Sequence, residues 1–329
     1  MKPRVVVVGS FVQDLMFRCA DFPQAGETVV GSFVTGPGGK GSNQAIACGR
    51  TGVPTLYVGA VGEDAFGREA EAYYRAAGIP AAFARKKSAA TGTAAILVNT
   101  AGQNEIVVAL GANEALQRRD LPLPALRSAE VLVCQCESNL ATTAHALRTA
   151  RRAGAITILN PAPMRPDFDL ELLHDVSVLI PNETEFASLL TRLPASGGRA
   201  LGADELQRLD PADLHTHCRR VGVPTVIVTL GSRGCLVSEQ GGHTFLPAHR
   251  GLDVVDTTGA GDAFVGGFAA GLVKHQGDRV KAAILGTAVA ALSVTKPGTA
   301  PAMPTQREIA AFFRGRAAGV RRRSGARRS

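Results

Sequence analysis

Short runs of consecutive apolar residues recur along the chain, and most are rich in valine and isoleucine. Runs that are apolar at every position are typical of strands buried on both faces of a parallel sheet, whereas half-exposed strands alternate. Six runs predict core strands: Val5–Gly9, Thr55–Val58, Val131–Cys134, Ile156–Leu159, Val178–Ile180 and Val226–Thr229.

Alanine-rich stretches lie between these runs and predict helices, for example at Asp64–Ala77, Ala141–Ala153 and Glu183–Leu190. Strands that alternate with helices are typical of an α/β fold. We therefore expect a central, mostly parallel sheet flanked by helices.

Two regions depart from this alternation and predict a small second sheet. One is Thr28–Thr35, and the other pairs Thr93–Asn99 with Glu105–Leu110 in the manner of a hairpin. We expect this sheet to form a lid from segments near 10–38 and 93–112. The stretch 191–215 is rich in Gly, Pro and Ala without a sustained period, which indicates a surface excursion.

Composition narrows the class of protein. With 329 residues, 45% of them hydrophobic, the chain can bury one large core or a core plus a small appendage. We expect no signal peptide, because the N-terminal apolar run is only four valines long. We expect no membrane span, because no run of about 18 consecutive apolar residues occurs. The six cysteines are scattered without the paired spacing of a zinc site, so reduced buried thiols and a cytoplasmic protein are expected.

The net charge of +8 comes almost entirely from one end of the chain. Seven arginines lie in the last sixteen residues, where no acidic residue occurs. No aromatic residue is interleaved there to stack on bases, so nucleic acid is an unlikely partner. We expect one domain at 1–313 followed by a basic, disordered tail at 314–329; an electrostatic tether to polyanions is the alternative.

The glycine-rich stretch GPGGKG (36–41) matches the dinucleotide pattern G-x-G-x-x-G only formally, because it follows a predicted lid strand rather than the first core strand. A P-loop is also disfavoured, since Lys40 is followed by Gly41 rather than Ser or Thr. The segment GGKGSN (38–43) instead suits a sugar-binding turn. Its glycines let the backbone approach a ligand, and Lys40 and Asn43 offer hydrogen bonds.

Two carboxylates follow predicted core strands. Asp14 comes after the first strand and Glu137 after Val131–Cys134. Open α/β sheets bind ligands at the carboxyl ends of their strands. A carboxylate can accept hydrogen bonds from two hydroxyl groups, so this pair suits a ribose-like sugar.

The stretch DTTGAGDAF (256–264) places small residues directly before a carboxylate. If Gly259, Ala260 and Gly261 begin a helix, their unpaired N–H groups and that of Asp262 form an anion hole. Asp262 would then stand ready to take a proton from a hydroxyl that attacks a phosphoryl group. A glycine-rich turn with a capping aspartate would explain this stretch alone, but not the other motifs.

The motifs together resemble the ribokinase (PfkB-type) family of sugar and nucleoside kinases, from Val5 to about Phe313. The resemblance rests on GGKGSNQA (38–45), QCES (135–138), LNPAP (159–163), PNETE (181–185), TLGSRG (229–234) and DTTGAGDAF. It implies ATP-dependent phosphorylation of D-ribose at O5, with Mg²⁺ and K⁺, by a homodimer that pairs through its lid. Alternatives are a kinase of another pentose, deoxyribose or a nucleoside, and a catalytically silent sugar-sensing protein.

The resemblance also implies residue roles. Asp262 is the base, and the amides of Gly259, Ala260, Gly261 and Asp262 hold the phosphate. The sugar positions are Val12, Gln13, Asp14, Gly39, Lys40, Gly41, Ser42, Asn43, Glu137 and Asp262. The nucleotide positions are Asn182, Thr229, Leu230, Gly231, Ser232, Arg233, Gly234, Gly261, Asp262 and Thr287. The potassium positions are Asp256, Thr258, Ser293, Lys296, Gly298 and Ala302, and Glu185 orders magnesium through water.

Three positions depart from the family pattern. Val12 stands where a sugar-contacting Asn is expected. This difference removes one polar contact, so the family pattern does not specify which sugar is bound. Lys296 replaces an Arg and Ala302 a Ser at the potassium loop. The site survives if those positions contribute only backbone carbonyls, and it is weakened if the Ser hydroxyl matters.

Overall fold

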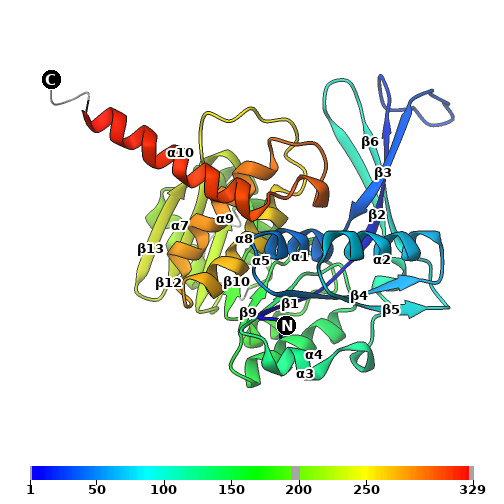
Figure 1. Cartoon of the computed structure of the whole chain (residues 1–329), viewed down its shortest axis with the longest axis horizontal. Coiled ribbons are helices and arrows are strands. Elements are labelled where there is room, and N and C mark those ends of the chain that lie inside the picture. The colour runs from blue at the N-terminus through cyan, green and yellow to red at the C-terminus, as the bar shows by residue number, and fades with distance from the viewer. Residues whose placement is uncertain (1, 194–200, 326–329) are drawn as a thin grey trace.

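The computed structural model describes residues 2–193 and 201–325, which form a nine-stranded sheet, a separate four-stranded sheet and the helices around them (Figure 1). The large sheet has the order β13-β12-β11-β10-β9-β8-β1-β4-β5. Its strands are β1 (Val5–Val8), β4 (Thr55–Gly62), β5 (Ala81–Lys86), β8 (Val131–Cys134), β9 (Ile156–Leu159), β10 (Val178–Leu179), β11 (Thr225–Thr229), β12 (Gly234–Glu239) and β13 (Gly242–Pro247).

The predicted α/β architecture is confirmed, and the six predicted core strands lie side by side in the large sheet. All of its pairings are parallel except those of β12, which runs antiparallel to both β11 and β13. Strand β1 shows why these strands read as continuous apolar runs. Val5 and Val7 enter one hydrophobic cluster and Val6 and Val8 the other, so both faces of the sheet are buried.

Helices cover both faces of the large sheet. The cluster on one face includes residues of α1, α2, α8 and α9, and the cluster on the other face includes residues of α3 to α7. The helices are α1 (Lys40–Arg50), α2 (Ala65–Ala77), α3 (Leu123–Ser128), α4 (Leu140–Arg152), α5 (Glu183–Arg192), α6 (Ala203–Arg208), α7 (Pro211–Arg219), α8 (Ala260–Lys274), α9 (Arg279–Ser293) and α10 (Gln306–Gly325). The three predicted helices correspond to α2, α4 and α5.

The small sheet rises from one end of the large one, as Figure 1 shows. Its order is β3-β2-β6-β7, with β2 parallel to β6 and the outer pairs antiparallel. The predicted hairpin is confirmed as β6 (Gly92–Val98) and β7 (Asn104–Ala109). The strand expected at Thr28–Thr35 instead lies at β3 (Ser32–Gly38), paired with β2 (Val12–Arg18).

Two segments differ from the sequence prediction. The excursion expected at 191–215 contains α6 and the start of α7; Pro211 begins α7 and Asp210 caps it by accepting the amide of Ala212 at 2.9 Å. Residues 194–200 and 326–329 lie outside the described residues. Helix α10 extends to Gly325 and so enters the segment 314–329 that the sequence predicts to be a basic tail.

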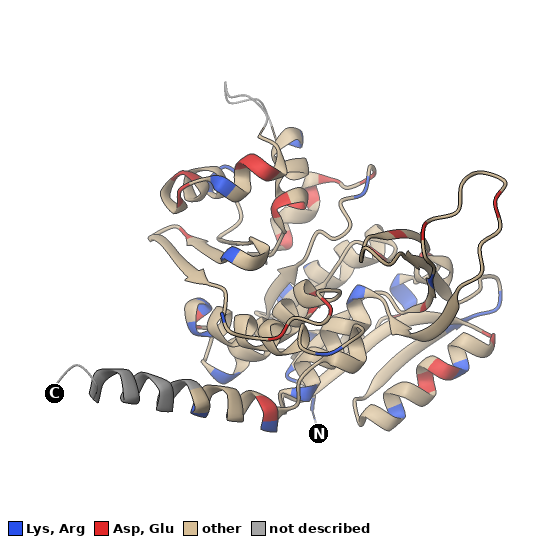
Figure 2. Cartoon of the chain, turned by 90° about the horizontal axis from the view of Figure 1, so that it is seen from above, with Lys and Arg blue, Asp and Glu red and all other residues tan. Residues whose placement is uncertain are grey.

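None of the helices in the described ranges is long and apolar enough to cross a membrane. All six cysteines are free thiols, and five of them are buried, as predicted. Lys and Arg residues are interspersed with Asp and Glu residues over the described elements in Figure 2.

Candidate active site

The starts of α1 and α8 lie side by side beneath the lid. A glycine makes this close approach possible, because a Cβ on Gly266 of α8 would lie 2.4 Å from the carbonyl oxygen of Gln44 in α1. Each helix also begins after a glycine with a positive φ, Gly39 with φ 87° and Gly259 with φ 77°. The predicted sugar-binding turn and the predicted anion hole therefore meet.

Asp262 lies in the first turn of α8 and is 8% exposed. Its two carboxylate oxygens accept hydrogen bonds from Asn43 Nδ2 and Gln44 Nε2, each at 2.9 Å. Burial raises the pKa of the Asp262 carboxyl, and the Lys40 charge and these two amides only partly offset the rise. A fixed carboxylate with a raised pKa suits a general base.

The backbone amides at the start of α8 are only partly available to an anion. The N–H of Ala260 donates to Thr257 O at 3.2 Å, so this amide already has an acceptor. Gly261 and Asp262 precede the first intrahelical bond, which runs from Ala263 N to Gly259 O. A Cβ on Gly261 would meet no atom within 4 Å, so the space above these amides is open.

Lys40 lies among four carboxylates. Burial alone would lower the pKa of its ammonium group, but the charges of Asp262, Glu137, Glu185 and Asp14 raise it. Lys40 therefore stays protonated. Its charge also offsets part of the repulsion between these acids, which lets them share one buried site.

Glu137 and Asp14 approach the site from different sheets. Glu137 accepts hydrogen bonds from Ser10 Oγ at 2.6 Å and from the Lys40 backbone amide at 3.0 Å. Asp14 comes after β1 in the chain and lies within β2, in the lid segment expected near 10–38. Burial, with the charges of Glu137 and Asp262, raises the pKa of the Asp14 carboxyl to about 7.

Several predicted sugar positions shape the site rather than point a polar group into it. Val12 is buried in the lid with Ala94 and Ile96. Gln13 donates to Thr35 Oγ1 at 2.7 Å within the lid sheet. A Cβ on Gly41 would lie 2.6 Å from the carbonyl carbon of Gly9, so this glycine allows helix α1 to pack against β1.

Ser42 likewise faces protein atoms. It is fully buried, and its Oγ accepts a hydrogen bond from the Tyr74 hydroxyl at 3.2 Å. The sugar positions that present polar groups near one another are thus Asp14, Lys40, Asn43, Glu137 and Asp262.

A cavity of about 190 Å³ joins the sugar side to the nucleotide side. It is lined by Lys40, Asn160, Ala162, Ile180, Asn182, Glu185, Thr229, Gly259, Gly261, Asp262 and Val265. Asn182 and Glu185 form a capping box at the start of α5, with Glu185 Oε2 accepting Asn182 N at 2.9 Å. Burial raises the pKa of Glu185 despite this bond.

Two predicted nucleotide residues are engaged elsewhere. The guanidinium of Arg233 donates to Leu209 O at 3.2 Å and lies over the Phe245 ring. Thr287 on α9 donates to Ile284 O at 2.9 Å. Gly231, Ser232 and Arg233 form a 3₁₀ turn between β11 and β12.

No site role was predicted for Gln44 and Asn160, although they lie in the motifs GGKGSNQA and LNPAP. Gln44 Nε2 donates to Asn160 Oδ1 at 3.0 Å as well as to Asp262, and Gln44 Oε1 accepts from Gln135 Nε2 at 2.6 Å. Asn160 in turn donates to Ile180 O at 2.8 Å. This buried network holds the Asp262 carboxylate in place, and the hint in the sequence is that polar residues interrupt apolar surroundings.

The residues of the predicted potassium loop are brought together. Asp256 accepts the backbone amides of Thr258 at 2.9 Å and Gly298 at 3.0 Å. These bonds lower the pKa of Asp256 although burial opposes them. Lys296 forms an ion pair with Glu308, and Ser293 Oγ donates to Ala290 O, so both side chains have protein partners outside the predicted potassium positions.

Among the described residues, no group of three or more His, Cys, Asp or Glu side chains could hold a metal ion. Glu185, the residue that the resemblance assigns to magnesium, lines the cavity.

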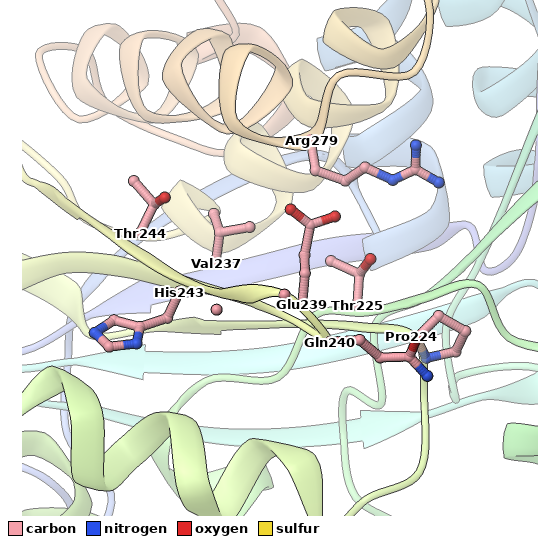
Figure 3. Close-up of a pocket in the computed structure, with 10 residues that line it drawn as sticks. Pro224, Thr225, Val237, Glu239, Gln240, His243, Thr244 and Arg279 are labelled. Carbon is pink, nitrogen blue, oxygen red and sulfur yellow. The ribbon is translucent and has the colours of Figure 1, made fainter.

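A larger hollow of about 680 Å³ lies away from this site (Figure 3). It is lined by the β12–β13 hairpin, the start of β11 and Arg279 of α9, and it includes none of the predicted site residues. Size therefore does not identify the active site here; the buried carboxylates and the helix starts do.

Comparison with known proteins places this geometry in a family context. The sequence pattern of the pfkB family carbohydrate kinase matches residues 2–306. Ribokinase of Mus musculus is 36% identical over 313 residues, 93% of each chain. Deoxyribokinase of Salmonella typhi is 32% identical over 305 residues, 92% of this chain and 95% of that protein.

Solved structures of ribokinases share the fold of this chain. Ribokinase from Giardia lamblia superposes with a TM-score of 0.85 at 31% identity and covers 96% of this chain and 99% of its own. Arabidopsis thaliana ribokinase complexed with ribose and ATP superposes with a TM-score of 0.80 at 30% identity, covering 94% and 98%.

Proposed function

The chain belongs to the pfkB family of carbohydrate kinases, and from this membership we propose that it transfers the γ-phosphoryl group of ATP to O5 of D-ribose. One observation carries the proposal: a buried Asp262 stands between the sugar-side carboxylates and the amides at the start of α8, in a cavity that also reaches Asn182 and Thr229. The relatives named ribokinase, and the plant structure with ribose and ATP, support this choice of substrates.

The sugar is held from two sides. Asp14 from the lid and Glu137 from the loop after β8 each accept sugar hydroxyl groups, and Asn43 lies beside Asp262 to hold the reacting end. Because the lid carries Asp14, closure of the lid over the sugar completes the sugar site and excludes water from the reaction.

In the transfer step, Asp262 takes the proton of the O5 hydroxyl as O5 attacks the γ-phosphorus. The new O5–P bond forms while the bond from phosphorus to the β–γ bridging oxygen breaks, and ADP leaves with that electron pair. The amides of Gly261 and Asp262 and the helix dipole stabilise the charge on the transferring group. Magnesium, when bound with the nucleotide, neutralises phosphate charge near Glu185.

A monovalent cation belongs to the same proposal. The loop around Asp256 and Gly298 joins directly onto the start of α8, and the lowered pKa keeps the Asp256 carboxylate ionised. Oxygen donors suit a hard cation. We propose that potassium binds this loop, with Thr258, Ser293, Lys296 and Ala302 contributing through their backbone.

A second substrate, 2-deoxyribose, is favoured by one residue. Val12, 2% exposed, replaces the Asn that the family pattern places at a sugar contact, so one polar contact to the sugar is lost. The similarity to a protein named deoxyribokinase points the same way. A cytoplasmic homodimer is also proposed, supported by the free cysteine thiols and the exposed apolar lid.

The test is release of ADP from ATP with a panel of D-ribose, 2-deoxy-D-ribose, D-fructose and inosine, with the product's phosphate position assigned by phosphorus NMR. We expect D-ribose to give the highest kcat/KM and the product to be the 5-phosphate. A higher kcat/KM with 2-deoxy-D-ribose than with D-ribose would make 2-deoxy-D-ribose the preferred substrate in place of D-ribose. Sugar binding by calorimetry without ADP release from any panel member would instead establish a sugar-sensing protein.

A further inference from the structure

The chain crosses between the large sheet and the lid four times, and the crossings meet at one point at the base of the lid (Figure 1). They lie before β2, after β3, before β6 and after β7. Glycines let the backbones touch: a Cβ on Gly39, after β3, would lie 2.6 Å from Val12 N, before β2. The lid is therefore anchored by this junction.

The side chain of Asn113 lies at the centre of the junction and is fully buried. Its Oδ1 accepts the backbone N–H of Phe11 at 3.0 Å, and its Nδ2 donates to Phe11 O and to Leu110 O, each at 2.8 Å. One amide thus joins the crossing before β2 to the crossing after β7. No apolar or acidic side chain of similar size supplies one acceptor and two donors in this geometry.

The third crossing presses against the same amide. A Cβ on Gly92, at the start of β6, would lie 2.5 Å from Asn113 Nδ2 and 2.9 Å from Leu110 O. A side chain at this position would displace the Asn113 amide or the backbone beside it. Glycine at 92 and asparagine at 113 therefore form one packed unit.

Asn113 also reaches the other half of the sugar site. Its carbonyl oxygen accepts the backbone N–H of Asn139 at 3.3 Å, two residues beyond Glu137. Its side chain holds Phe11, three residues before Asp14. The same residue thus contacts the segment that carries each sugar-side carboxylate.

We propose that Asn113 is a positioning residue that sets the spacing between Asp14 and Glu137, and thereby the affinity for the sugar. The proposal rests on the proposed sugar kinase function. The nucleotide side should be insensitive to Asn113, because Asn182 and Thr229 lie on β10–α5 and β11 and make no contact with this junction among the hydrogen bonds of the described residues.

The first experiment compares Asn113→Ala and Asn113→Asp with the parent enzyme. Asn113→Asp keeps the shape and the acceptor for Phe11 N–H, but it turns a carboxylate oxygen toward the carbonyls of Phe11 and Leu110. We expect KM for the preferred panel sugar to rise at least tenfold in both variants, with KM for ATP changed less than twofold. Asp210→Ala, which removes the cap of α7 far from the lid, is the control for a general loss of stability.

The second experiment perturbs the junction from its other side with Gly92→Ala. We expect the same selective rise in sugar KM. In the double variant Asn113→Ala with Gly92→Ala, the effects should be less than additive, because the amide that the new methyl group would displace is already absent.

Equal changes in sugar and ATP KM, or a sugar KM within twofold of the parent in folded Asn113→Ala, would overturn the proposal. So would a matching rise in sugar KM in Asp210→Ala. Failure of all junction variants to fold would also overturn it, since Asn113 would then serve folding rather than affinity. If the proposed kinase function is wrong, the parent enzyme itself will phosphorylate no sugar, and this result is distinct from any effect of the variants.

Discussion

The neighbours of Asp262 make a clean test of its role possible. Asn43 Nδ2 donates to the carboxylate, while Asn43 Oδ1 is buried without a hydrogen-bond partner. If Asp262 were replaced by Asn, rotation of the Asn43 amide would present this Oδ1 to the new Nδ2. The site can therefore accept an uncharged residue of the same shape without two amide groups facing each other donor to donor.

Asp262→Asn should fold normally and lose activity. The amide cannot take the proton of the attacking hydroxyl, and general-base catalysis typically contributes ~10²–10⁴-fold. We expect kcat to fall by at least this range, while ATP affinity measured by calorimetry stays close to that of the parent. A folded variant with near-parental turnover would show that Asp262 serves only to join α8 to Asn43 and Gln44 of α1, a role that an amide of the same shape can also fill.

Gly261→Ala should separate activity from stability. The new methyl group would meet no protein atom within 4 Å, and alanine is favoured over glycine inside a helix by roughly 0.8–1.0 kcal/mol. We expect an unchanged or higher free energy of unfolding in urea, with kcat/KM for ATP reduced at least tenfold because the methyl group enters the space above the Gly261 and Asp262 amides.

The control for this prediction is Gly241→Ala in the turn between β12 and β13, where a Cβ also meets nothing within 4 Å. It should leave both activity and the free energy of unfolding close to the parent values. Full activity of Gly261→Ala would mean that no phosphate approaches these amides.

Asp14 should make sugar binding depend on pH near neutrality. The pKa of its carboxyl is raised to about 7 by burial and by Glu137 and Asp262, so the group is largely protonated at pH 6 and ionised at pH 8. Only the carboxylate accepts hydrogen bonds at both oxygens. We expect KM for the sugar to fall as pH rises from 6 to 8, and this fall to vanish in Asp14→Asn.

The same shift has a stability consequence of known sign. Because the pKa of Asp14 is higher in the folded protein than its ordinary value of 3.8, the folded state binds the proton more tightly than the unfolded chain. The contribution of this group to the free energy of unfolding therefore declines as pH rises from about 3.8 to about 7. Asp14→Asn should unfold at higher urea than the parent at pH 8, and an equal midpoint would contradict the raised pKa.

At the scale of elements, the α8 start and the loop before it act together. Backbone amides of Val255 and Asp256 donate to Val294 O, which ties the loop to the end of α9. Asp256 then binds Gly298 N from the following turn. An ion among these segments would stiffen the turn that positions Gly259 and the amides after it.

Potassium should raise activity over buffer that contains neither potassium nor sodium. We expect a severalfold rise in kcat for the parent and none for Asp256→Ala, which loses the carboxylate that joins both segments. The rise should survive in Lys296→Arg, since the Lys296 side chain is directed toward Glu308. Equal rates of the parent with and without potassium would show that this loop is a structural turn.

The sequence predicted elements best where both faces are buried. β1 and β8 are completely buried and appear as uninterrupted apolar runs. β5 and β13 were missed because they are the edge strands of the large sheet and are not buried on both faces. β12 was missed although it lies inside the sheet, because only three consecutive apolar residues, Cys235 to Val237, stand between Gly234 and Ser238. The helices α6 and α7 were missed because six and nine residues are too few to show a helical period.

The sequence motifs predicted which residues belong to the candidate site, but not how those residues contact one another. Adjacent glycines and an aspartate indicated the start of α8, but the sequence could not show that Ala260 N–H is already bonded to Thr257 O. It placed Asp14 within the expected lid segment, but it could not show that this carboxylate approaches Glu137 and Asp262 closely enough to feel their charges. Contacts such as Gln44 with Asp262 join residues more than two hundred positions apart, and no local pattern records such pairs.

At the scale of the whole molecule, β7 is unusual for a strand at the edge of a sheet. All six of its residues are exposed, and three consecutive apolar residues, Ile106, Val107 and Val108, point to both faces. Consecutive apolar residues are typical of a strand covered on both sides. Phe33 and Val34, on β3 at the opposite edge, are exposed by 52% and 59%.

A second copy of the chain would cover this surface. Contiguous exposed apolar patches mark interaction sites, and a specific dimer buries roughly 1,200–2,000 Å² in total. The lid sheet is the element on which these apolar side chains gather, and it also carries Asp14. A dimer through the lid would therefore hold β2 in place as well as bury apolar surface.

We predict that the parent chain sediments as a dimer at micromolar concentration and that Val107→Asp sediments as a monomer. Val107 is 70% exposed in the single chain, so the charge should not disturb the fold; in the dimer it would be buried without a partner, at a large cost. Ile284→Asp on α9, 40% exposed and outside the lid, is the matched control and should remain dimeric. If the lid dimer also steadies Asp14, the monomeric variant should show a higher sugar KM with an unchanged ATP KM. A parent chain that sediments as a monomer would leave the apolar surface of β7 without this explanation and would remove the dimer from the proposal.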